Sequence, residues 1–157
     1  MNRLTLGDRF KKVIKLLPDR DRTVVFLMKQ AGEGVKFGSV IAGRLAKMDS
    51  DTFARRRKLL MEYFAYLEQL HKRWDNVILK LHRAVSPRLM ARALDYIEVP
   101  IVPAYKFGKL WGISSTTVRT WTRDLRARLI RSGDDELKWV SGQLRILSFG
   151  QKKNRRI

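Results

Sequence analysis

The chain has 157 residues, 45% of them hydrophobic, which suits one domain or two small domains with a substantial core. Thirty-four Lys and Arg residues outnumber fifteen Asp and Glu, and the resulting net charge of +19 makes a polyanion, above all nucleic acid, the expected partner. The absence of cysteine excludes disulfides and cysteine-based metal sites or nucleophiles, and no stretch approaches the length of a transmembrane helix.

The basic residues are spread along the whole chain. Up to Val85 there are 19 basic and 9 acidic residues, and after it there are 15 and 6. An anionic membrane surface and an acidic protein are weaker alternatives to nucleic acid as the partner. Because the first residues lack the apolar core of a signal peptide, we expect a cytoplasmic, nucleoid-associated protein with no membrane partner.

Residues 1–50 are predicted to form an N-terminal helical domain. Apolar residues at helical spacing indicate a helix over 5–17, which Pro18 ends. A second helix begins after Asp19 and ends before the turn at 32–34, and a third spans 36–47.

Residues 51–85 are predicted to form a long connecting or dimerisation helix. The pattern runs from Thr52 to about Ala84 without proline or glycine. Apolar residues recur at every seventh position, namely Phe53, Leu60, Leu67, Trp74 and Leu81. Two interpretations stay open: the seam packs against the protein's own helices, or it forms a homodimer.

Residues 86–150 carry the clearest local signals. Ser86 and Pro87 indicate the start of a helix over 87–97, and the proline-containing run 99–103 is predicted to be a short extended segment. Further on, strand-like runs at 137–140 and 144–149 flank Ser141-Gly142-Gln143 and predict a small β-hairpin. Residues 151–157 form a basic tail.

Between these elements, residues 104–123 meet every local requirement of two helices joined by a tight turn. Gly108 supplies a small residue where the chain passes close by, and Gly112 tolerates a positive φ in the turn. Ile113 can plug the turn and Ser114 can cap the second helix. The two helices share an apolar face made of Phe107, Trp111, Val118 and Trp121.

This segment resembles the helix-turn-helix superfamily of DNA-binding proteins. With the helix before it and the predicted hairpin after it, the stretch 86–149 resembles a winged-helix domain. The resemblance implies a recognition helix from Thr116 to Ile130 that lies in the major groove of duplex DNA. The expected fold class is therefore mainly α, with a C-terminal winged helix.

The exposed side of that helix carries short hydroxyls, suited to phosphates, and arginines that can reach base edges. The candidate residues are Ser115, Thr116, Thr117, Arg119, Thr120, Arg123 and Arg126. Arg119 and Arg123 lie one turn apart and are the candidates for base contacts. Further candidates for phosphate contacts are Arg145 in the predicted wing and, in the tail, Lys152, Lys153, Arg155 and Arg156.

A second, degenerate helix-turn-helix is predicted upstream. Residues 40–53 echo the same order, with Ala42 as the small residue and Met48 as the plug, although the turn is longer and lacks the glycine. The stretch 17–60 resembles region 4 of bacterial sigma factors, which implies RNA polymerase as a partner. A second DNA site would then include Arg55, Arg56, Arg57 and Lys58; the alternative is a solvated basic face.

Other sites find little support. The glycines of 32–38 have the wrong spacing for a dinucleotide loop, and His71 and His82 have no clustered partner ligands. The acidic run 134–136 is interpreted as solvated. We therefore expect no metal, no cofactor, no small-molecule substrate and no enzymatic activity.

The favoured function is sequence-specific binding of duplex DNA by a transcription regulator of bacterial, phage or plasmid origin. A non-catalytic DNA-binding subunit for replication, partition or recombination would use the same domain, so the sequence does not separate the two. RNA binding is a third alternative, although the aromatic sheet and loop motifs of single-strand readers are absent.

Overall fold

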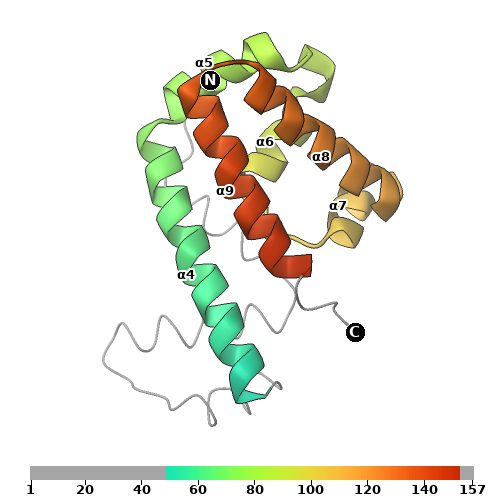
Figure 1. The fold of residues 1–157 in the computed structure, drawn as a ribbon. Coiled ribbons are helices and arrows are strands. Elements are labelled where there is room, and N and C mark those ends of the chain that lie inside the picture. The colour runs from blue at the N-terminus through green and yellow to red at the C-terminus, as the bar shows by residue number, and fades with distance from the viewer. Residues whose placement is uncertain (1–48, 153–157) are drawn as a thin grey trace. The chain divides into compact units, whose positions relative to one another are not determined.

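The computed structural model describes residues 49–152, most of which are helical (Figure 1). This range holds the helices α4 (Ser50–Lys72), α5 (Trp74–Ala84), α6 (Met90–Glu98), α7 (Ala104–Trp111), α8 (Ser115–Arg131) and α9 (Asp135–Lys152). The mainly helical class is thus confirmed for this part of the chain. The predicted helices before residue 48, most of the degenerate upstream motif, and the tail residues Lys153, Arg155 and Arg156 lie outside the described residues.

Residue contacts divide the chain after Phe64 into two units, and the second unit holds α5 to α9. Within it, α9 packs against both α5 and α8, and α7 packs against α8. Helix α8 thus packs against both the helix before it and the helix after it in the sequence. Its buried residues follow helical spacing: Val118, Thr122, Leu125 and Leu129.

The predicted β-hairpin over 137–149 is wrong, because these residues belong to helix α9 and the described residues contain no strand. Leu137, Val140, Leu144 and Leu147 are all buried, and their spacing of three and four residues is that of one helical face. Gly142 is exposed, and a Cβ atom built on it would meet nothing within 4 Å, so it interrupts no packing. No wing hairpin therefore follows α8 in the described part of the chain.

The predicted long helix over 52–84 is divided at Arg73, whose φ of −108° and ψ of 9° separate α4 from α5. The guanidinium of Arg73 lies 4.6 Å from the ring centroid of Trp139 on α9, a cation–π contact that holds this corner. The residues of the heptad seam keep their pattern across the break. Buried within the single chain are Phe53, Leu60, Leu67, Trp74 and Leu81.

Pro87 opens a short 3₁₀ turn, η1 (Pro87–Leu89), that runs directly into α6. Ser86 occupies the N-cap position as expected, but its side chain makes no capping hydrogen bond. The segment 99–103 is non-helical, as predicted, but it forms a buried turn in which the Val102 amide donates to the Val99 carbonyl, and not an extended strand.

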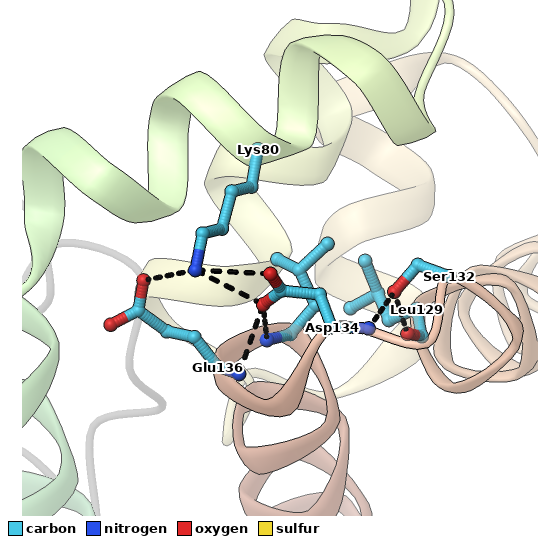
Figure 2. A network of polar contacts seen from close by, with 6 residues as sticks. Lys80, Leu129, Ser132, Asp134 and Glu136 are labelled. Carbon is cyan, nitrogen blue, oxygen red and sulfur yellow. Dashed lines mark hydrogen bonds and ion pairs between the residues drawn. The ribbon is translucent and has the colours of Figure 1, made fainter.

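The turn between α8 and α9 is fixed by a polar network that Lys80 of α5 completes (Figure 2). The Oδ1 atom of Asp134 accepts the amide protons of Glu136 and Leu137 at 2.9 and 3.0 Å, so Asp134 caps the start of α9. The Lys80 ammonium lies 3.0 Å from Asp134 Oδ2 and 3.3 Å from Glu136 Oε1. The acidic run is thus partly paired and not simply solvated, and it ties α5 to the base of α9.

Among the described residues, no helix is both long enough and apolar enough to cross a membrane.

Candidate nucleic-acid interface

Helices α7 and α8 are joined by a turn of three residues, Gly112, Ile113 and Ser114. Gly112 has a φ of 71°, in the left-handed region that side chains disfavour, as the sequence predicted. The amides of Gly112 and Ile113 both donate to the Gly108 carbonyl, at 2.9 Å for Ile113. This left-handed C-cap provides hydrogen-bond donors for a backbone carbonyl at the end of α7, and it changes the direction of the chain at one residue.

Gly108 is the position at which the turn folds back onto α7. A Cβ atom built there would lie only 2.6 Å from the carbonyl oxygen of Ile113. Backbone atoms block even a methyl group at this residue, which confirms the prediction that position 108 needs a small residue.

Ser114 caps α8, which is also confirmed. Its Oγ accepts the Thr117 amide at 3.1 Å and lies 2.8 Å from the Thr117 hydroxyl. The Ser114 carbonyl accepts the Val118 amide, so the first turn of α8 is closed by both backbone and side chain.

An aromatic cluster holds the angle between α7 and α8. The rings of Phe107 and Trp111 stack at 4.6 Å, and Trp111 meets Trp121 edge-on at 5.4 Å. From α6, Tyr96 contacts Phe107 edge-on at 6.2 Å, and Asp95 Oδ2 accepts the indole N–H of Trp111 at 3.3 Å. Trp111 and Trp121 therefore pack, as expected, although both stay half-buried, and Trp111 is also positioned by its hydrogen bond to Asp95.

The opposite side of α8 is open to solvent. Thr116, Thr120 and Arg123 recur at intervals of four and three residues and are all exposed, as is Thr117 beside them. Ser115 and Arg119 are half-buried at the edge of this stripe. We call the stripe of Thr116, Thr120 and Arg123 the α8 face; Thr116 lies near the helix start, Thr120 one turn further on, and the long cation Arg123 one turn after that.

Arg126, which the sequence placed on the same side, is directed elsewhere. It is half-buried, and its Nη1 donates to the Tyr96 hydroxyl at 2.7 Å. Arg145 is exposed, but it lies on α9 and not in a wing. Lys152 closes α9, and its side chain is outside the described set.

The four basic residues near the start of α4 do not form one continuous surface. Arg55 and Lys58 are exposed, and the guanidinium of Arg55 donates to Thr52 Oγ1 at 3.3 Å. Arg56 is 7% exposed, and the guanidinium of Arg57 lies 5.7 Å from the centroid of the Phe53 ring. Burial at every third or fourth position of an amphipathic helix explains why a run of four cations is split.

Several exposed basic side chains of α7 and α8 are absent from the sequence-based candidates. Lys109 is exposed on α7, the helix that precedes the turn, and Arg128 and Arg131 are exposed further along α8. Lys109 could have been found from its spacing, because it follows Tyr105 by four residues on the side of α7 away from Phe107. Helix α8 carries five arginines and a single acidic residue, Asp124.

In the part of the chain that the structure describes, no group of three or more His, Cys, Asp or Glu side chains is placed to hold a metal ion. Comparison of the chain with protein-family models, with curated protein sequences and with solved structures finds no significant match.

Proposed function

We propose that the protein is a sequence-specific duplex-DNA-binding protein in which α7, the turn and α8 act as a helix-turn-helix with α8 as the recognition helix. The observation that carries this proposal is the pairing of a three-residue turn, closed by Gly108 and Gly112, with an exposed α8 face opposite a buried one. In a helix-turn-helix the second helix presents its exposed face to the major groove, which is wide enough to admit an α-helix.

The chemistry of the α8 face supports the same function. Thr116 and Thr117, which are exposed near the start of α8, carry short hydroxyls suited to phosphate oxygens. Arg123 is exposed and long enough for bidentate contact with guanine O6 and N7, which is the commonest specific contact in the major groove. Arg119, at the edge of the stripe, is the second candidate for a base contact.

The charge of the protein supports duplex DNA as the polyanion. The net charge is +19, and Lys109 on α7 and Arg128 on α8 are exposed cations outside the α8 face. Cations in such positions neutralise phosphates and give affinity without sequence preference, while the α8 face selects the site. Control of transcription is the biological role that we propose for this binding.

The proposal is tested by fluorescence anisotropy with a duplex selected from a random library and with a scrambled duplex of the same length. Arg123→Ala should lower the preference for the selected duplex by about ten- to a hundredfold, the range for losing one bidentate base contact. Arg128→Ala removes the same charge from an exposed position outside the stripe, and we expect it to weaken both duplexes equally.

Three results would contradict the proposal in different ways. If Arg123→Ala and Arg119→Ala both keep the wild-type preference for the selected duplex, the residues that recognise the sequence lie outside α8. Stronger competition by RNA than by duplex would identify RNA as the polyanion. Selection that enriches no sequence would leave only non-specific binding.

A further inference from the structure

A cavity of about 500 Å³ lies along the side of α8 that adjoins the α8 face. Its walls come from α6, the 99–103 turn, α7, α8 and α9, so it belongs wholly to the second unit. Val102, Phe107 and Val118 are almost fully buried and give it an apolar lining. Its size is within the range of cavities that bind small organic ligands.

Polar groups meet at one part of this apolar wall. The Tyr96 hydroxyl, from a side chain only 2% exposed, accepts from Arg126 at 2.7 Å and lies 2.9 Å from the Ser148 hydroxyl. Arg119, two turns before Arg126 on α8, also lines the cavity. Tyr96, Ser148 and Arg126 thus form a polar cluster on the cavity wall. Arg119 brings a second guanidinium group to the same cavity.

These two cations have no counter-charge in the cavity. None of its lining residues is Asp or Glu, and neither Arg119 nor Arg126 forms an ion pair among the described residues. The partner of Arg126 is a neutral hydroxyl. A half-buried guanidinium against an apolar wall is poorly compensated in this state, and a carboxylate matches its fork of N–H donors in two parallel hydrogen bonds.

We propose that this cavity is a binding site for a small organic acid, a carboxylate joined to an apolar group. The carboxylate would bind Arg126, with Arg119 as the second cation. The apolar group would lie against Val102, Phe107 and Val118. The combination of an apolar lining with a few convergent polar groups is typical of small-molecule sites, and the charge of those groups selects an anion.

Isothermal titration calorimetry of the full chain with cinnamate and with its neutral analogue cinnamamide tests the proposal. We expect cinnamate to bind at least about tenfold more tightly than the amide. Arg126→Gln should remove that preference, while Arg128→Gln, which takes the same charge from an exposed position of α8, should leave it unchanged.

A second variant tests the cavity itself and leaves both arginines in place. Ala104→Trp fills the space from its α7 wall and should abolish cinnamate binding, while circular dichroism checks that the helices are retained. If Arg126→Gln does not fold, Ala104→Trp decides. Each of three results would overturn the proposal: no heat of binding from cinnamate at millimolar concentration, equal affinity for cinnamate and cinnamamide, or unchanged cinnamate binding by Ala104→Trp. The titration contains no DNA, so its result is independent of the proposed function.

Discussion

Gly108 and Ile113 approach so closely that a methyl group on the glycine would lie 2.6 Å from the Ile113 carbonyl oxygen. That oxygen belongs to the backbone of the turn and cannot rotate away as a side chain could. The contact therefore fixes how tightly the turn folds onto α7, and with it the direction in which α8 leaves the turn.

We expect Gly108→Ala to destabilise the protein by about 1–3 kcal/mol, because the backbone must shift to admit the methyl group. The sign is informative, since alanine in place of a helical glycine ordinarily stabilises a helix by up to about 1 kcal/mol. Gly142→Ala provides the matched control, because nothing lies within 4 Å of a Cβ at that position of α9. Thermal unfolding by circular dichroism should show opposite shifts in Tm, and a stabilised Gly108→Ala variant would contradict the turn geometry.

The hydroxyl of Ser114 is predicted to contribute to the stability of α8 through its bond to the Thr117 amide. Ser114→Ala should cost about 1 kcal/mol, and Ser114→Asp should recover most of it, because either oxygen can accept this amide proton. Ser86→Ala is the control, because Ser86 also occupies an N-cap position but makes no capping bond. Equal losses from both serines in urea unfolding would show that the hydroxyl bond at Ser114 does not carry the effect.

If α8 is the recognition helix as proposed, Lys109 should contact a DNA phosphate and not a base, because it is exposed on α7. Lys109→Ala should lower the affinity for the selected and the scrambled duplex by the same factor. It should also make the slope of log affinity against log salt shallower by about 0.9, the value for one lost phosphate contact. A change in the preference between the two duplexes would instead place Lys109 against a base edge.

The sequence predicted the α7–turn–α8 segment closely because its determinants are local. A glycine at a close approach, a glycine at positive φ, a serine cap and apolar spacing all fall within twenty residues, and α8 spans Ser115–Arg131 against the predicted 116–130. Each of these requirements involves residues at most a few positions apart. Tertiary context has little left to decide there.

The sequence did not predict α9, because its apolar residues are clustered as well as periodic. Two apolar runs, Leu137 to Val140 and Leu144 to Phe149, look like strands on either side of Ser141-Gly142. The same leucines are also spaced as on one face of a helix. Packing against α5 and α8 selects the helix, and the Asp134 cap supports it. The placement of Arg126 depends in the same way on distant residues, since Tyr96, its partner, lies 30 positions earlier.

The network of Lys80, Asp134 and Glu136 should make stability depend on pH in acid (Figure 2). The Leu137 amide and then Lys80 hold the pKa of Asp134 below its ordinary value. The hydrogen bond with Asp134 in turn raises the pKa of Lys80. A carboxylate with a lowered pKa stabilises the fold above its ordinary value, near pH 4, and this contribution is lost as the pH falls through the folded pKa. The Lys80 ammonium, whose pKa is raised, stabilises the fold below about pH 10, and this stabilisation is lost only as the pH rises above that value.

Asp134→Asn should therefore lower Tm at neutral pH, and its deficit against the wild type should shrink as the pH falls below about 4. Lys80→Met should also lower Tm at neutral pH, because it leaves Asp134 and Glu136 without their shared cation. Asp124→Asn removes the same charge from an exposed position of α8 with no ion pair among the described residues, and it should have little effect throughout. Melting curves between pH 2 and 8 measure all three. An Asp134→Asn deficit that stays constant across this range would show that the carboxylate charge adds nothing to the cap of α9.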